Sequence, residues 1–125
     1  DGGRVRVTCV DYCLSQVVEQ QIDDLASFLG RHRPEWVKVR WINVDGLSDM
    51  GAIHALATKY ELHPLAIEDL LHLSDRPKVE PYGGEDSELR ARLFIVARAL
   101  ELKDGRLASR QISIFLGHNT VLTFC

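Results

Sequence analysis

The sequence predicts an α/β fold, a single layered domain with a mixed β-sheet. Strand-like and helix-like segments alternate in the first part of the chain, and several strand-like segments follow at its end. The resulting order, ββαβααβββ give or take a short element, is typical of α/β domains with a mixed sheet. With 125 residues, of which 46% are apolar, the chain is long enough for one domain with a hydrophobic core and too short for two.

The first part of the chain is predicted to contain three strands and one helix. Residues 5–12 alternate between apolar and polar side chains, as a strand with one buried face does, and residues 16–22 form a shorter candidate strand. Residues 23–30 begin with two acids and end with a glycine, which predicts a helix. The β-branched and aromatic residues of 36–44 predict the third strand, which an Asp-Gly turn ends.

Two helices are predicted next. Ser48 is placed to cap the first of them, and its apolar residues recur at helical spacing, which predicts one buried face. That face consists of Met50, Ile53, Leu56, Ala57 and Tyr60. The second helix is predicted over residues 64–72, since Pro64 suits the first helical position, and His63 is interpreted as its cap rather than as a ligand. Its predicted apolar side consists of Ile67, Leu70 and Leu71.

The end of the chain is predicted to be rich in strands. Residues 91–102 and 106–117 form two long strand-like segments. Asp104-Gly105 lies between them, and Asp-Gly between two apolar segments is a strong hairpin signal. A short extended piece over 78–82 precedes this hairpin, and a last strand over 120–124 follows it.

The composition limits the partners and the location of these residues. The chain carries 15 basic and 18 acidic residues, a formal net charge of −3, which argues against nucleic-acid binding and against direct contact with a membrane surface. No apolar stretch reaches the roughly 20 residues of a membrane span, and the first residues do not resemble a signal peptide. The three cysteines show no disulfide framework. We therefore expect a cytosolic location.

Glu68, Asp69 and His72 lie within one turn of the second middle helix and are candidate metal ligands. Glu68 and His72 are four residues apart and share a helix face, with Asp69 beside it. One or two carboxylates often suffice for Mg²⁺, which keeps several water ligands, whereas Zn²⁺ prefers histidine and about four ligands. The alternative is a solvent-exposed helix face without a metal, and the spacing alone favours that alternative.

Other polar motifs have simpler interpretations. Asn43 and Asp45 flank the end of a predicted strand and are interpreted as turn residues that bond to nearby backbone. The Arg-Pro-Lys segment 76–78 is expected to pair with neighbouring acids such as Asp75 or Glu80 rather than with phosphate. The chain has no glycine-rich phosphate loop, no nucleophile elbow and no zinc-protease or Cys-x-x-Cys motif, so no catalytic residue is predicted.

Three phrases in the middle of the chain read WINVDGL at 41–47, HPLAIEDLL at 63–71 and RPKVEPY at 76–82. In their order and spacing they resemble the amino-terminal cytosolic domain of CorA-type divalent-cation channels. The similarity runs over nearly the whole chain and includes the segments LFIVARAL (93–100), QISIFLG (111–117) and NTVLTF (119–124). The chain also ends in a strand-like run without a polar tail, which predicts that it is part of a longer protein.

The resemblance implies an α/β/α sandwich around a mixed sheet, with residues 1–125 forming one regulatory domain at the cytoplasmic face of the cell membrane. It implies that the parent protein is a homopentameric Mg²⁺ or Co²⁺ channel whose later part supplies a long helix, two membrane spans and a Gly-Met-Asn loop. The implied partners are these later helical and transmembrane regions and the neighbouring subunits.

The resemblance also implies a regulatory metal site at Glu68 and Asp69, with Asp69 the preferred ligand and His72 an additional candidate. In the family, this acidic pair lies between subunits and binds a divalent cation together with an acid from the neighbour's long helix. Bound cations hold the subunits in a closed state. Because the neighbour's acid is absent from this chain, we expect a weak, about millimolar, Mg²⁺ affinity.

Three alternatives remain for the function. One is the zinc-transporting branch of the same superfamily, which resembles ZntB and to which His72 lends some support. Another is a soluble metal-dependent hydrolase that would use Glu68, Asp69, His72 and His63. The third is a protein-interaction domain with no metal role. Mg²⁺, Co²⁺ and Zn²⁺ are therefore the ions to be distinguished.

Overall fold

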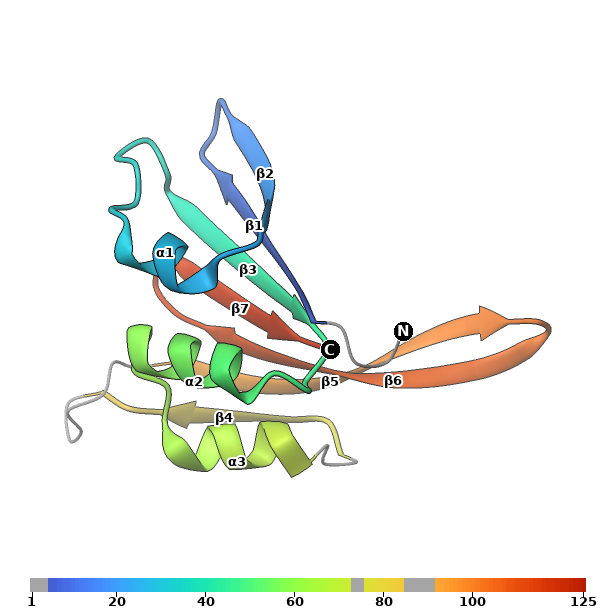
Figure 1. Ribbon diagram of the computed structural model, residues 1–125. Helices are drawn as coiled ribbons and strands as arrows, with labels where there is room; N and C mark the ends of the chain where they lie inside the picture. The colour runs from blue at the N-terminus through green and yellow to red at the C-terminus, as the bar shows by residue number, and fades with distance from the viewer. Residues whose placement is uncertain (1–4, 73–75, 85–91) are drawn as a thin grey trace.

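A seven-stranded mixed β-sheet forms the centre of the structure, a computed structural model that describes residues 5–72, 76–84 and 92–125 (Figure 1). In chain order its strands are β1 (Arg6–Tyr12), β2 (Val17–Ile22), β3 (Val39–Asp45), β4 (Lys78–Tyr82), β5 (Arg92–Lys103), β6 (Arg106–Leu116) and β7 (Thr120–Phe124). Their order across the sheet is β2-β1-β3-β7-β6-β5-β4. β3 and β7 pair in parallel and the other neighbours pair antiparallel, so the predicted mixed sheet is confirmed.

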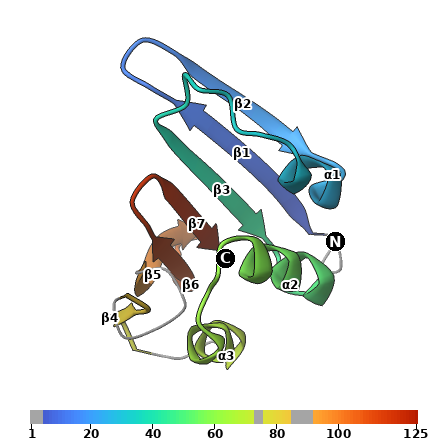
Figure 2. The same ribbon diagram turned by 90° about the vertical axis from the view of Figure 1, so that its left-hand side faces the viewer.

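Three helices, α1 (Leu25–Gly30), α2 (Met50–Lys59) and α3 (Pro64–His72), pack on one face of this sheet (Figures 1 and 2). The elements follow the predicted order, and the short piece over 78–82 is a true strand, β4. The predicted α/β fold class is therefore confirmed. In the described residues α1 begins after the cap Asp24, whose carboxylate accepts a hydrogen bond from the Ser27 N–H, as expected for an acid at a helix start.

The hydrophobic core lies between the helices and the sheet. One row of side chains crosses five strands at its centre, and each member is at most 2% exposed; the row consists of Cys9, Ile42, Leu122, Phe115 and Phe94. The helices add buried apolar residues beside this row: Phe28 and Leu29 from α1, Ala52, Ile53 and Leu56 from α2, and Ala66 and Leu70 from α3. Removing these side chains from water is the main favourable contribution to folding.

The opposite face of the sheet is also apolar, but it is partly exposed. The strand register aligns Trp41, Val121, Leu116 and Leu93 in one row. Trp41, Leu116 and Leu93 are 41%, 39% and 39% exposed. No helix of the described residues covers this face (Figure 2). The described part of the chain thus supplies one of the two helical layers of the α/β/α sandwich that the resemblance implies.

Helix α2 differs from the prediction in its cap and in its buried face. The cap is Asp49 rather than Ser48, and Asp49 Oδ1 accepts a hydrogen bond from the Ala52 N–H at 3.0 Å. Met50, which the spacing places in the core, is 53% exposed. It lies about 120° around the helix from Leu56, at the centre of the buried face. The sheet contacts a narrower arc of α2 than the apolar pattern covers.

Helix α3 is rotated relative to the prediction in a similar way. Its buried residues are Ala66 and Leu70, whereas Ile67 is half-buried and Leu71 is 38% exposed. At about 100° per residue, Leu71 lies about 120° from the direction midway between Ala66 and Leu70. The small Ala66 allows the helix to approach the sheet closely, so it rather than Leu71 sets the inward side.

The β5–β6 hairpin is confirmed at its predicted turn. Lys103 pairs with Arg106, so Asp104 and Gly105 form a two-residue loop, and their φ angles are 50° and 75°. Two positive φ angles characterise the type I′ turn, whose twist matches that of the flanking strands. The hairpin extends beyond the rest of the sheet as an arm (Figure 1).

We predict that Gly105→Ala lowers the free energy of unfolding by about 1 kcal/mol, because a side chain is strained at a φ of 75° even with open space around it. Gly30→Ala is the matched control: nothing lies within 4 Å of an added Cβ, and the glycine ends α1 without a positive φ. The control should be neutral or stabilise by up to about 1 kcal/mol. Urea unfolding measures both variants, and equal midpoints would contradict the type I′ assignment.

Candidate functional site

Helix α3 positions the candidate metal ligands at the edge of the helical layer. It begins at Pro64, and the backbone N–H of Leu65 donates a hydrogen bond to His63 Nδ1 at 3.1 Å. The interpretation of His63 as a helix cap is therefore confirmed. The His63 ring also lies 4.9 Å from the ring of Tyr82 in β4, measured between centroids. The cap and this contact hold the start of α3 against the edge strand of the sheet.

Glu68 and His72 point away from the core. Glu68 Oε1 and His72 Nε2 are 3.9 Å apart, and the two side chains are 64% and 72% exposed. A solvent-exposed pair of this kind contributes about 0–1 kcal/mol. Asp69 is turned in another direction. In residues 5–72, 76–84 and 92–125, no three His, Cys, Asp or Glu side chains are grouped so as to hold a metal ion.

Asp69 lies beside β4, and its carboxylate is bound by the Lys78 ammonium group. The same ammonium contacts Glu80 Oε1 at 2.7 Å and lies 5.9 Å from the centre of the Phe94 ring. The side chains of Lys78, Asp69 and Glu80 are 27%, 33% and 42% exposed. The hydrogen bonds of Lys78 to Asp69 and then to Glu80 raise the pKa of this lysine. One ammonium group thus binds two carboxylates, and the three side chains together keep one net negative charge.

The contacts of Lys78 settle part of one sequence prediction. Segment 76–78 was expected to pair with neighbouring acids, and the pairing of Lys78 with Glu80 is confirmed. Asp75, the other acid considered, lies outside the described residues. The contact of Lys78 with Asp69 is not predictable from spacing, since the two residues are nine positions apart and lie in different elements, β4 and α3.

Asn43 has a different role from the one its position predicts. Its side-chain oxygen accepts a hydrogen bond from the Thr123 hydroxyl at 2.6 Å, and the Trp41 indole N–H donates to the same hydroxyl at 2.8 Å. The interpretation of Asn43 as a residue that bonds to nearby backbone is wrong, because β3 continues to Asp45 and places Asn43 opposite Thr123 of β7. The three side chains form a polar link across the open face.

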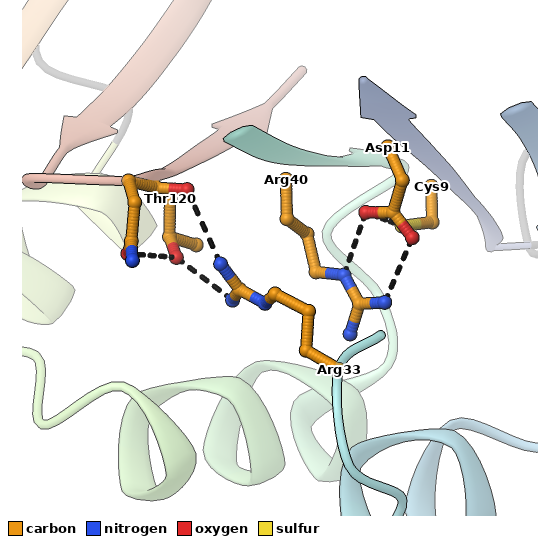
Figure 3. Close-up of polar contacts among 6 residues, drawn as sticks. Cys9, Asp11, Arg33, Arg40 and Thr120 are labelled. Carbon is orange, nitrogen blue, oxygen red and sulfur yellow. Dashed lines mark hydrogen bonds and ion pairs between the residues drawn. The ribbon is translucent and has the colours of Figure 1, made fainter. Parts of the chain in front are cut away.

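A buried ion pair joins β1 to β3 and is absent from the sequence predictions (Figure 3). Arg40 Nε and Nη2 donate to the two carboxylate oxygens of Asp11, each at 2.8 Å, and both side chains are at most 7% exposed. The Arg40 guanidinium also lies 4.6 Å from the centre of the Phe28 ring. Cys9 donates a weak hydrogen bond to Asp11 at 3.5 Å. The geometry is the bidentate one that makes such pairs strong and specific.

The surroundings of this ion pair lower the pKa of Asp11 and raise the pKa of the neighbouring Cys9 thiol. Burial by itself raises the pKa of Asp11, but the hydrogen bonds and the charge of Arg40 outweigh it and hold the pKa below its usual value. Burial, reinforced by the Asp11 charge, raises the pKa of the Cys9 thiol to about 12. The Cys9 side chain is therefore a neutral core residue rather than a nucleophile.

The alternation of β1 already contains a signal for this pair. Val7 and Cys9 alternate on the inward face, and the next inward position along the strand is Asp11. In β3 the inward series Ile42 and Val44 continues backwards to Arg40. A charged residue at an inward position of each of two strands predicts a buried pair, because an unpaired buried charge is strongly unfavourable.

Comparison with known proteins decides the family. A family model described as "CorA-like Mg2+ transporter protein" matches residues 36–125, which include α2, α3, Asp69 and Lys78. The chain belongs to the CorA family. The resemblance carried by the three central phrases is therefore confirmed. None of the helices in the described part of this CorA-family chain combines the length and the apolar character that crossing a membrane requires.

Relatives of the chain are larger proteins. The cobalt/magnesium transport protein CorA of Thermotoga maritima is 31% identical over 86 residues, which cover 67% of this chain and 22% of that protein. The complete structure of the CorA magnesium transporter from Methanocaldococcus jannaschii matches with a TM-score of 0.56 and 19% identity, over 94% of this chain and 31% of that one. The soluble domain of the same CorA matches with a TM-score of 0.56 and 18% identity, over 94% and 39%. These two structures share the fold.

We predict that Asp11→Asn lowers the free energy of unfolding at neutral pH by about 3–5 kcal/mol, because it leaves the buried Arg40 guanidinium without its counter-charge. In the parent chain, the stabilising contribution of Asp11 is complete above its unfolded pKa of about 4 and is lost as the pH falls through its lower folded pKa. Urea unfolding between pH 7 and pH 2.5 should show this acid-sensitive part in the parent and not in the variant.

Glu101→Gln is the control for this titration, since Glu101 is an exposed carboxylate on the hairpin arm. It should change the stability at pH 7 by about 0.5 kcal/mol or less and keep the acid sensitivity of the parent. An Asp11→Asn variant that loses stability in acid as steeply as the parent would show that this carboxylate is not stabilised by Arg40.

Proposed function

We propose that this chain is the cytosolic regulatory domain of a CorA-type divalent-cation channel, in which intracellular Mg²⁺ bridges neighbouring subunits and favours the closed pentamer. Membership of the CorA family supports this proposal, and the similar Thermotoga maritima protein is named as a cobalt/magnesium transport protein. The observation that carries the regulatory part is the Asp69 carboxylate, which lies at a surface edge and is held by a replaceable ammonium group.

Asp69 is suited to exchange one cation for another. One third of its side chain is exposed, so its carboxylate can be reached from solvent, and Lys78 has a second acid, Glu80, to which it remains bonded if Asp69 is taken over. In the proposed site Mg²⁺ replaces Lys78 at Asp69, water fills most of its coordination sphere, and an acid of the neighbouring subunit adds a further ligand. Glu68, the next residue along α3, is proposed to contribute a second carboxylate from the exposed side.

Bound Mg²⁺ would then stabilise one arrangement of the subunits over another. Acids that face each other across a subunit boundary repel unless a cation lies between them. Mg²⁺ therefore favours the arrangement in which the boundary is closed, and its loss at low intracellular concentration favours the open one. Co²⁺ is proposed to bind to the same oxygen ligands. The approach of His72 to Glu68, at 3.9 Å, is the contact that a zinc-transporting alternative would use.

The open face of the sheet supports a proposal about the rest of the protein. Trp41, Val79, Leu93 and Leu116 lie on this face and are between 39% and 61% exposed. Apolar patches of this kind mark surfaces that another element covers. We propose that residues 1–125 form one domain and that the later helical region of the same protein supplies the second helical layer, on the cytoplasmic side of the membrane.

We predict that the chain binds Mg²⁺ with a dissociation constant of about 1 mM or weaker, since one subunit offers an incomplete set of ligands. Asp69→Asn should abolish this binding, and Lys78→Met should strengthen it about tenfold, because the competing ammonium is removed. Lys103→Met, at an exposed lysine of the hairpin arm, is the matched control and should leave it unchanged. Titration by NMR measures all four chains. Equal Mg²⁺ affinity in all of them would place the site elsewhere.

The regulatory proposal is tested in the full-length protein, reconstituted in vesicles. Asp69→Asn should allow metal flux at an internal Mg²⁺ concentration that closes the parent channel, because the bridge between subunits is lost. Identical inhibition of both proteins by Mg²⁺ would overturn the regulatory role. A chain in which Mg²⁺ changes neither assembly nor flux would be an interaction domain. Phosphoester turnover that is lost in Asp69→Ala would instead support the hydrolase alternative.

A further inference from the structure

A basic pocket lies on the helical side of the domain, and none of its lining residues belongs to α3. It is a cavity of about 300 Å³ between the segment that follows α1, the end of α2 and the start of β7. Its lining includes five basic side chains, Arg31, His32, Arg33, Arg40 and Lys59, and no acid. This concentration of positive charge contrasts with the formal net charge of −3 of the whole chain.

Most of the positive charge in the pocket is uncompensated. Arg40 is neutralised by Asp11. Arg31, Arg33 and Lys59 form no ion pair within the part of the chain that the structure describes. Arg31 and Lys59 are exposed, so their charges can approach a ligand without a large desolvation cost. Three positive charges around one cavity repel each other, and an anion bound between them removes that repulsion.

Two of the guanidinium groups are already held in place. Arg33 donates to the Thr120 hydroxyl at 2.9 Å and to the Asn119 carbonyl oxygen at 3.2 Å. Arg40 is fixed by Asp11, and its remaining nitrogen points away from that carboxylate (Figure 3). A guanidinium whose orientation is fixed loses little further freedom when it binds an oxyanion, so more of its interaction appears as affinity.

We propose that this pocket binds a phosphoryl group, either as inorganic phosphate or as part of a small phosphorylated molecule. Arginine guanidinium groups match the oxygens of a phosphate in pairs, and lysine adds a point charge. The volume is at the lower end of the range for small-molecule sites, which leaves room for a phosphoryl group with a modest substituent. The pocket lies on different elements from Asp69, so this proposal does not depend on the regulatory metal site.

One feature of the fold opposes anion binding here. Helix α2 ends at Lys59, and the carboxyl end of a helix carries about half a negative charge. Lys59 itself offsets that partial charge. The full charges of Arg31 and Arg33 remain, so the local potential stays positive.

The test is a titration of the 125-residue chain with sodium phosphate at constant ionic strength, with sodium chloride as the balancing salt, followed by NMR. We expect saturable binding that Arg31→Gln and Lys59→Gln each weaken about five- to tenfold, since each removes one charge near a doubly charged anion. Arg106→Gln is the control and should change the affinity less than about twofold, since Arg106 begins β6 in the hairpin arm, which extends away from α1 in Figure 1.

A parallel titration with a nucleoside diphosphate distinguishes the two sources of the phosphoryl group. Tighter binding than inorganic phosphate, lost in the same two variants, assigns the site to a phosphorylated small molecule; equal or weaker binding assigns it to free phosphate. The proposal is overturned if phosphate has no more effect than chloride, or if Arg106→Gln weakens binding as much as the pocket variants do. Asp69→Asn should leave phosphate binding unchanged, which separates this result from the metal proposal.

Discussion

The parallel pairing of β3 with β7 is the contact on which the rest of the structure depends. β2, β1 and β3 form one antiparallel half of the sheet, β4 to β7 form the other, and this pairing joins them. It sets Leu122 and Phe124 beside Ile42 and Val44, so that the apolar rows of the two halves merge into one core. A parallel pair requires a long crossover, and the crossover here contains α2 and α3, which the sheet then buries on one side.

The same junction arranges polar groups on both faces. On the helical face it pairs Arg40 with Thr120, the residue that holds Arg33, and so it assembles the basic pocket. On the open face it pairs Asn43 with Thr123. The pocket and the open apolar surface therefore lie on opposite sides of one pair of strands. The proposed contact of the later helical region with the open face would therefore leave the basic pocket on the other face.

Asp11 and Asp69 illustrate how burial separates structural from exchangeable ion pairs. Asp11 is almost fully buried and bound at both oxygens by a guanidinium, so its replacement leaves an uncompensated charge in the core. Asp69 is one-third exposed and shares a single ammonium with Glu80. A cation from solvent can compete for the second acid but not for the first. Surface position, rather than residue type, makes Asp69 the acid suited to the proposed regulatory role.

The sequence by itself determined the elements whose signals are local. Alternation in β1, the Pro64 start of α3 and the Asp104-Gly105 turn each depend on interactions within a few residues, and all three are confirmed. The central phrases also placed the chain in its family. Only the tertiary structure decided which side of each helix is buried, with Met50 and Leu71 left exposed. It also decided the partners of the charged groups, because Asp11 and Arg40 are 29 residues apart. Those contacts follow from strand register and helix packing, which the whole core sets at once.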